Sequence, residues 1–348
     1  MKKKLIFPTF LIIFLFVVAA VYFALRLQMM PVSSQTEEKV RFEVPFGTSA
    51  RKISSDLKAS GIIKNDTFFY AAIKYPFILK FFFPSSNISV SDLKSGTYYV
   101  SKNMNYSELL EILMSGQQEY IHVSVPEGLT ITKIASILEQ NGICSKEAFI
   151  SSCHKAEFIE YIGINADSCE GFLFPDTYFF NSGMDSDSVV KIMIDNFFEK
   201  VSSISSAASL KGQDLFDFVI LSSIVEREYR VEEEAPLIAS VFKNRLNRNI
   251  GLYSCATVEY ILTEILGREH PKVILIEDTK INNPYNTYKW AGLPPGPISN
   301  PGMVALKACA DTPKTNYYYF QIADPSEGRH VFTTTFDEHV SSHNLYTK

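Results

Sequence analysis

The sequence lacks the features that mark several common classes of protein. It has five cysteines and six histidines in 348 residues, with no Cys-x-x-Cys pair and no zinc-like spacing, so we predict no metal site and no cofactor. The formal net charge of −5 leaves no basic surface of the kind that binds nucleic acid. It contains no Gly-x-Ser-x-Gly elbow, no Walker-type phosphate loop and no His-Glu-x-x-His motif, which argues against the enzyme classes that those motifs define.

The cysteines leave the redox state open. Cys144, Cys153 and Cys169 lie close in sequence, and one disulfide among them is compatible with an oxidising compartment. Buried free thiols are the alternative. The odd count of five leaves at least one cysteine without an intramolecular partner.

An uncharged apolar run near the N-terminus predicts a membrane anchor. It covers residues 5–25 and follows a cytoplasmic tip, residues 1–4, with three lysines. Such a helix spans about 30 Å, the thickness of the hydrocarbon layer, and the lysines stay on the cytoplasmic side. A cleaved signal peptide, the alternative, has a shorter apolar core and a small-residue cleavage site. We predict a single-pass protein of the cell inner membrane, extracytoplasmic (periplasmic) beyond a linker at 26–39.

Two related segments follow the linker, about 80 residues apart. Val-Pro-Phe-Gly at 44–47 is matched by Val-Pro-Glu-Gly at 125–128, and the apolar and glycine positions behind each turn also match. Each segment reads as a short strand, a turn where Gly47 or Gly128 takes positive φ, and a helix closed by a glycine. This β-turn-α unit, used twice, predicts an α+β fold.

The rest of the chain divides into longer elements. Apolar spacing predicts helices over 189–201, 215–229 and 235–248, and strands in the segment after Lys314. The apolar stretch 75–84 is too short to cross a bilayer. We expect it to be core, with a patch that lies along the membrane as the alternative.

Glu226 is the residue most suited to acid–base chemistry. It follows a strongly apolar stretch of its helix, with Ser223 three residues earlier on the same face. A carboxyl group in partly apolar surroundings has a raised pKa and stays protonated near neutral pH, as a general acid must. The alternative is a solvated glutamate that pairs with Arg230. Glu228 is expected to point elsewhere, because residues two apart do not share a helix face.

An aromatic, turn-rich segment at 284–302 is the second candidate. It contains Tyr285, Asn286, Tyr288 and the only tryptophan, Trp290. Prolines and glycines fix its irregular backbone, and aromatic faces beside an amide suit sugar rings. A rigid structural loop is the alternative.

The stretch 170–180 supplies the nearest candidates for a second carboxylate, Glu170 and Asp176. Ordinary glycosidases need a pair of carboxyl groups that flank the bond. We favour a structural role for Asp176, which precedes the strand of the second repeat.

Taken together, these stretches resemble the endolytic murein transglycosylase family, also called MltG or YceG-like. The resemblance runs from about residue 40 to residue 343 and includes the anchor. It is carried by VPEG (125–128), LKSGTYYV (93–100), EGFLFPDTY (170–178), LSSIVEREY (221–229), SVFKNRL (240–246), YNTY (285–288), GLPPGPISNPG (292–302) and NYYYF (316–320).

The resemblance implies a LysM-like module over 40–120 and a transglycosylase catalytic domain over 121–348. Such a lytic transglycosylase is a lyase that cuts the MurNAc-GlcNAc bond of nascent peptidoglycan glycan strands and leaves 1,6-anhydro-MurNAc ends. The muramoyl 6-hydroxyl is the nucleophile, so one carboxyl group suffices, and by family position the general acid/base is Glu226. The family also implies cooperation with cell-wall synthases. We expect four residues to bind substrate: Ser223, Tyr285, Asn286 and Tyr288.

The sequence departs from the family at one place. Members commonly carry Asp-Pro where this chain has Cys255-Ala256. The loss of that aspartate motivates a second hypothesis, a catalytically degenerate scaffold that binds peptidoglycan during cell-wall assembly. A third is a hydrolase that uses water and leaves reducing ends.

Overall fold

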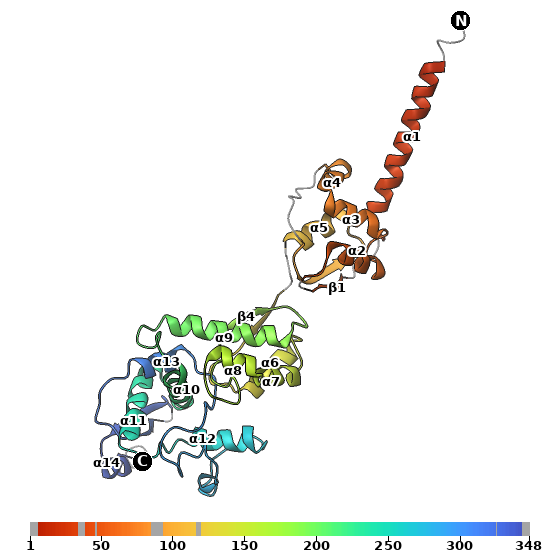
Figure 1. Cartoon of the computed structure of the whole chain (residues 1–348). Coiled ribbons are helices and arrows are strands. Elements are labelled where there is room, and N and C mark those ends of the chain that lie inside the picture. Colours follow the sequence, from red (N-terminus) through yellow and green to blue (C-terminus); the bar gives the residue numbers. More distant parts are fainter. Residues whose placement is uncertain are drawn as a thin grey trace. The chain divides into compact units, whose positions relative to one another are not determined.

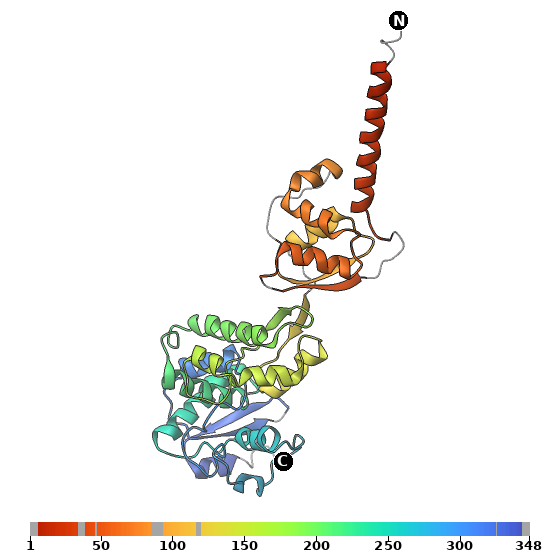
Figure 2. The same ribbon diagram turned by 45° about the vertical axis from the view of Figure 1, so that its right-hand side comes forward.

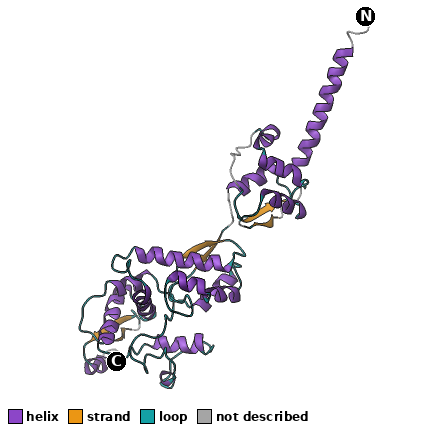
Figure 3. Ribbon diagram, viewed as in Figure 1, coloured by secondary structure: helices purple, strands orange, loops and turns teal. Residues whose placement is uncertain are grey.

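The computed structural model describes residues 6–33, 39–45, 47–84, 93–115, 120–324 and 326–342, and divides the chain into two compact units. Unit 1 is Met1–Tyr120 and unit 2 is Ile121–Lys348 (Figure 1). Helices predominate, and the described strands pair into three antiparallel two-stranded sheets (Figure 3). The predicted α+β class is confirmed. The predicted cytoplasmic tip and residues 34–38 of the predicted linker lie outside the described residues.

Unit 1 begins with a helix that is long and apolar enough to cross a membrane over Leu11–Met29. The small fold behind it places three helices between two paired strands. Its elements are α1 (Ile6–Met29), β1 (Lys39–Val44), α2 (Ala50–Ala59), α3 (Asp66–Lys74), α4 (Pro76–Phe82), β2 (Gly96–Ser101) and α5 (Tyr106–Ser115).

Helix α4 contains most of the apolar stretch 75–84, and it is only half core. Leu79 and Phe82 are buried, whereas Phe77 is 70 % exposed and Phe81 is 65 % exposed. The ring of Tyr22 in α1 stacks on Phe82 at 5.1 Å between centroids. The exposed ring of Phe81 also lies beside α1, at 5.5 Å between its centroid and that of Tyr22.

Unit 2 contains two sheets and most of the helices. The strand pair β3–β4 and the pair β5–β6 lie at different ends of the unit (Figure 2). Its elements are β3 (Ile121–Ser124), α6 (Ile131–Gln140), α7 (Lys146–Cys153), α8 (Ala156–Ile162), β4 (Thr177–Phe180), α9 (Ser186–Ser202), α10 (Gly212–Glu226), α11 (Ala235–Asn247), α12 (Cys255–Tyr260), α13 (Met303–Ala310), β5 (Tyr319–Asp324), β6 (Arg329–Thr333) and α14 (Phe336–Ser342), with the short helices η1 (Glu232–Glu234), η2 (Ile261–Ile265) and η3 (Asp278–Lys280).

The two sequence repeats adopt the same local structure. Gly47 and Gly128 both have positive φ, at +77° and +74°, where a side chain would be strained. The helices that follow, α2 and α6, are each capped by a hydroxyl, from Ser49 in the first copy and Thr130 in the second. In each copy the first strand pairs antiparallel with the strand that closes it. The predicted β-turn-α unit is present twice.

The core of unit 2 surrounds α10. This helix packs against α11 and α13, and nine of its residues are buried. The predicted helices over 189–201, 215–229 and 235–248 correspond to α9, α10 and α11, and strands do follow Lys314. The five cysteines are free thiols, and Cys153, Cys169 and Cys309 are buried.

Candidate active site

Glu226 is the last residue of α10 and is half-buried. Its Oε2 atom accepts a hydrogen bond from the backbone N–H of Gly302 at 2.9 Å, and its Oε1 atom accepts one from the Tyr229 hydroxyl at 3.1 Å. Burial raises the pKa of Glu226 to about 7, outweighing these two bonds, which favour the charged form. The carboxyl group is therefore partly protonated at neutral pH.

The Val-Pro-Glu-Gly turn of the second repeat lies against Glu226. A Cβ atom added to Gly128 would lie 3.5 Å from Cγ of Glu226 and 3.3 Å from Cδ of Arg227. Glu127 is exposed, and a Cβ atom added to Gly302 would lie 2.3 Å from its Cγ. Three segments that are far apart in sequence therefore meet at the candidate acid, and two of them contribute a glycine.

The buried side chains of Asn300 and Glu170 stabilise the contact between these segments through hydrogen bonds. The Asn300 side chain is buried; it accepts hydrogen bonds from the N–H groups of Gly171 and Leu173 and donates to Leu129 O and Glu170 Oε1. Both oxygens of Glu170 also accept from the N–H of Ile131. Burial raises the pKa of the Glu170 carboxyl group to about 8. Its role is structural, because its hydrogen bonds join the segments of Ile131 and Asn300.

The helix face next to Glu226 that contains Ser223 is not accessible to substrate. Ser223 is fully buried, and its hydroxyl accepts from the N–H of Ile298 at 3.0 Å. Its carbonyl accepts from the Ser299 hydroxyl at 3.1 Å. Ser223 therefore anchors the loop at 292–302 to α10, where we had expected it to contact substrate.

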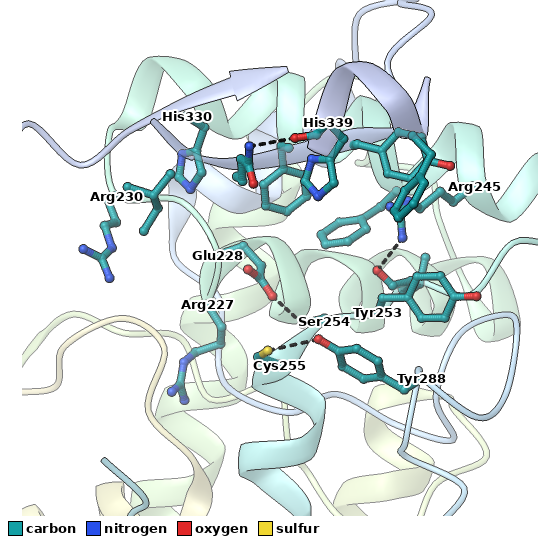
Figure 4. A pocket seen from close by; sticks show the side chains of 17 residues that line it. Arg227, Glu228, Arg230, Arg245, Tyr253, Ser254, Cys255, Tyr288, His330 and His339 are labelled. Atoms are coloured by element: carbon teal, nitrogen blue, oxygen red, sulfur yellow. Dashed lines mark hydrogen bonds between the residues drawn. The ribbon is translucent and has the colours of Figure 1, made fainter. Parts of the chain in front are cut away.

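A cavity of about 550 Å³ opens next to the end of α10 (Figure 4). Glu228 lines it and accepts a hydrogen bond from Ser254, and burial raises the pKa of Glu228 to about 7. Arg227 also lines it and pairs with Glu259 at 2.8 Å. Glu226 is not among the lining residues. The two glutamates thus point in different directions, as expected from their spacing, but it is Glu228 that faces the cavity.

The Tyr-Asn-Thr-Tyr segment contributes one side chain to the cavity. Tyr288 lines it, with its hydroxyl 3.0 Å from the Cys255 thiol. Asn286 is fully buried; its amide donates to two backbone carbonyls and its Oδ1 accepts from the N–H of Tyr288. Tyr285 packs on the ring of Tyr260. Asn286 and Tyr285 therefore shape the loop that presents Tyr288.

Sequence reasoning missed two cavity residues. Glu228 was given no role because it cannot share a helix face with Glu226, yet it is Glu228 that lines the cavity. Arg245 of α11 lies in the SVFKNRL stretch and was given no role, but it lines the same cavity. The carbonyls of Gly251, Leu252 and Tyr318 hold its guanidinium in place, and the contact with Tyr318 is one that no local pattern encodes.

The fold is that of a known class of protein. The YceG-like family matches residues 42–344 of the chain. The chain belongs to the YceG-like family.

Named relatives extend this result. An endolytic murein transglycosylase of Bacillus subtilis is 30% identical over 332 residues, which are 91% of this chain and 87% of the relative. One of Streptococcus pneumoniae is 27% identical over 341 residues, which are 89% of this chain and 59% of the relative. The crystal structure of a yceG-like protein from Listeria monocytogenes matches with a TM-score of 0.55 at 28% identity, covering 88% of this chain and 99% of that one.

Proposed function

We propose that this chain is a membrane-anchored endolytic peptidoglycan lytic transglycosylase that uses Glu226 as its acid and base. The observation that carries the proposal is a half-buried carboxyl group with a pKa of about 7 at the end of a buried helix. Membership of the family and the names of its relatives support the reaction class.

The chemistry requires one group that gives up a proton and then takes one back. Protonated Glu226 donates its proton to the glycosidic oxygen as the bond from that oxygen to C1 of the muramoyl residue breaks. The muramoyl 6-hydroxyl then bonds to C1, and its proton passes to the carboxylate. Glu226 returns to its starting state and a 1,6-anhydro end remains. Because the nucleophile belongs to the substrate, no second carboxylate has to activate water.

Tyr288 is the aromatic residue best placed to contact a sugar. It lies on the cavity wall, and the buried amide of Asn286 fixes its backbone. An aromatic ring can pack on the apolar face of a pyranose while its hydroxyl bonds to the edge. In this proposal Ser223, Tyr285 and Asn286 act on substrate indirectly, by holding the loop.

The anchor and the first unit belong to the same proposal. Helix α1 has the length and composition of a membrane span, which supports a single-pass anchor with the enzyme outside. The strand–helices–strand order of unit 1 supports a LysM-like module that binds glycan. Cell-wall synthases remain the expected partners, on the family resemblance alone.

Full-length protein in detergent should be incubated with uncrosslinked glycan strands and the products analysed by mass spectrometry. We expect 1,6-anhydro ends from the wild type and a loss of about a thousandfold in rate for Glu226→Gln, in the range of general acid catalysis. Above a pH of about 7 the rate should fall, because the group that must donate a proton becomes deprotonated.

Glu228→Gln is the matched control, since its carboxyl group has a similarly raised pKa and lies two residues away. We expect a smaller loss for this variant. Loss confined to Glu228→Gln would reassign the acid to the residue that faces the cavity. Reducing ends would indicate hydrolysis by water, and no cleavage under any condition would support the scaffold hypothesis.

A further inference from the structure

A buried arginine on the cavity wall has no counter-charge. Arg245 is 7 % exposed, and its Nε donates to Tyr318 O at 2.6 Å. Its Nη1 donates to Gly251 O at 3.0 Å and to Leu252 O at 3.1 Å. Within the described residues Arg245 has no carboxylate within 4.0 Å, and Nη2 has no acceptor. Nη2 is also not sealed from solvent.

Burial of the Arg245 charge costs free energy unless a further acceptor binds to it. A buried charge loses its hydration, and backbone carbonyls replace only part of that loss. Burial accordingly lowers the pKa of Arg245. A guanidinium has five N–H donors; the bonds in place engage Nε and Nη1, and the two donors of Nη2 remain. The bonds that are made also fix the group, so little conformational entropy would be lost when an anion binds.

Two tyrosine rings lie next to the guanidinium group of Arg245. Its Cζ atom lies 5.3 Å from the ring centroid of Tyr253 and 5.0 Å from that of Tyr319, and both residues line the cavity. Tyr253 is 49 % exposed and has a φ of +53°, a strained conformation for a residue with a side chain. Such strain persists where the surrounding structure enforces it, and it is common at binding sites.

The charges around the cavity favour an anion at this end. Three arginines and one glutamate line it, and of the arginines only Arg227 has an acidic partner within the described residues. Glu228 is held by Ser254. Figure 4 shows Arg245 beside Tyr253 at the end away from Glu228 and Cys255. The one glutamate that lines the cavity therefore lies away from Arg245, next to the candidate catalytic helix, and Arg245 places a positive charge at the other end.

We propose that Arg245, Tyr253 and Tyr319 form a subsite for a carboxylate on the 3-O-lactyl arm of a muramoyl residue. The inference rests on the proposed function, because it takes the cavity as part of the glycan site. In peptidoglycan only the muramoyl sugar carries this arm, whereas N-acetylglucosamine is neutral. A carboxylate subsite would therefore tell the enzyme which of the two alternating sugars occupies the cavity and so fix which glycosidic bond is presented.

The carboxylate can come from two sources that the subsite reads through the same chemistry. One is the lactyl group itself on a sugar without peptide, and the other is the stem peptide attached to it. Either presents an oxygen that can accept a charge-assisted hydrogen bond from Nη2.

Binding to monosaccharides tests the subsite independently of cleavage, because these ligands contain no bond for the enzyme to cut. Calorimetric titration of the full-length wild type in detergent should compare N-acetylmuramic acid, its methyl ester and muramoyl dipeptide. We expect the acid to bind about 10- to 100-fold more tightly than the ester, in the range of a hydrogen bond to a charged group. The ratio of dipeptide to acid shows which carboxylate is preferred.

Arg245→Gln should abolish the preference for acid over ester, and Arg245→Lys should reduce it, since lysine keeps the charge but lacks the planar group that the backbone carbonyls hold in place. If Arg245→Gln fails to fold, Arg245→Lys provides the readout. Arg248→Gln is the control. It removes the same charge from the end of the same helix, but this residue is exposed and does not line the cavity. It should leave the ratio unchanged.

The outcomes against the proposal are distinct. Equal affinity of the wild type for acid and ester, or no affinity for either, would overturn it. So would an Arg245 variant that weakens both ligands equally, because that result indicates a purely structural role. Cleavage that persists in any of these cases would leave the proposed function standing while the subsite fails.

Discussion

The two copies of the β-turn-α unit show how one local structure serves two purposes. In the described part of unit 1, Gly47 has nothing within 4 Å of the position where a Cβ atom would be placed. Gly128 in unit 2 has the same backbone conformation, yet its turn packs on Glu226 and Arg227. The turn is built by the local sequence in both copies. What distinguishes the second copy is the structure that packs against it, which turns a helix-entry motif into one wall of a candidate active site.

Loss of the hydrogen bonds made by the Asn300 side chain gives the largest expected effect on stability. Asn300→Ala would leave the buried N–H groups of Gly171 and Leu173 without a partner and remove one of the hydrogen bonds to the buried Glu170 carboxyl, at a cost of about 3 to 5 kcal/mol. Hydrogen exchange followed by mass spectrometry should show this loss in unit 2 only.

Asn65→Ala is the corresponding test in unit 1. Asn65 caps α3 through a single bond to the N–H of Phe68, so we expect a cost of about 1 kcal/mol. A loss for Asn300→Ala no larger than that for Asn65→Ala would contradict the view that this buried amide joins the second copy to the site.

The sequence was sufficient for the parts of the fold that local chemistry determines. The glycine turns, the hydroxyl caps and the presence of the helix that contains Glu226 follow from residue type and spacing, although the predicted helix ran on to 229 and α10 ends at Glu226. The contacts of the 127–128 turn with Glu226 and Gly302 do not, because they join segments that are about a hundred residues and more apart. For the same reason the orientation of Asn286 could not be inferred, since an amide in an aromatic loop is equally suited to sugar or to backbone.

Adding a methyl group to Gly128 or to Gly47 is expected to have an intermediate effect. Gly128→Ala and Gly47→Ala share the cost of a side chain at positive φ, about 1 kcal/mol in each. Only the first places the new methyl group in a tight contact with Arg227, at 3.3 Å, and in van der Waals contact with Glu226, at 3.5 Å. We expect glycan cleavage to fall about tenfold in Gly128→Ala, since small displacements of a catalytic group reduce rate strongly. Equal rates in both variants would show that the turn does not position the carboxyl group.

A pair of tyrosines gives the smallest effect and the most closely matched comparison. Tyr98 in β2 donates its hydroxyl proton to the carbonyl of Lys94 at 2.7 Å, and Tyr178 in β4 donates to that of Phe174 at 2.5 Å. Each bond reaches back four residues, so both copies brace their second strand in the same way. Tyr178 also accepts from Asn196 of α9 at 3.0 Å.

Changing either tyrosine to phenylalanine removes the hydroxyl and keeps the buried ring. We expect Tyr98→Phe to cost about 1 kcal/mol and Tyr178→Phe about 1 kcal/mol more, because the second change also breaks the bond to α9. Hydrogen exchange resolved by unit would measure both, and cleavage should be unchanged in each. Equal costs would mean that α9 contributes nothing to the strand pair of the second copy. The distinction between the copies would then lie at the 127–128 turn and the buried Asn300 amide alone.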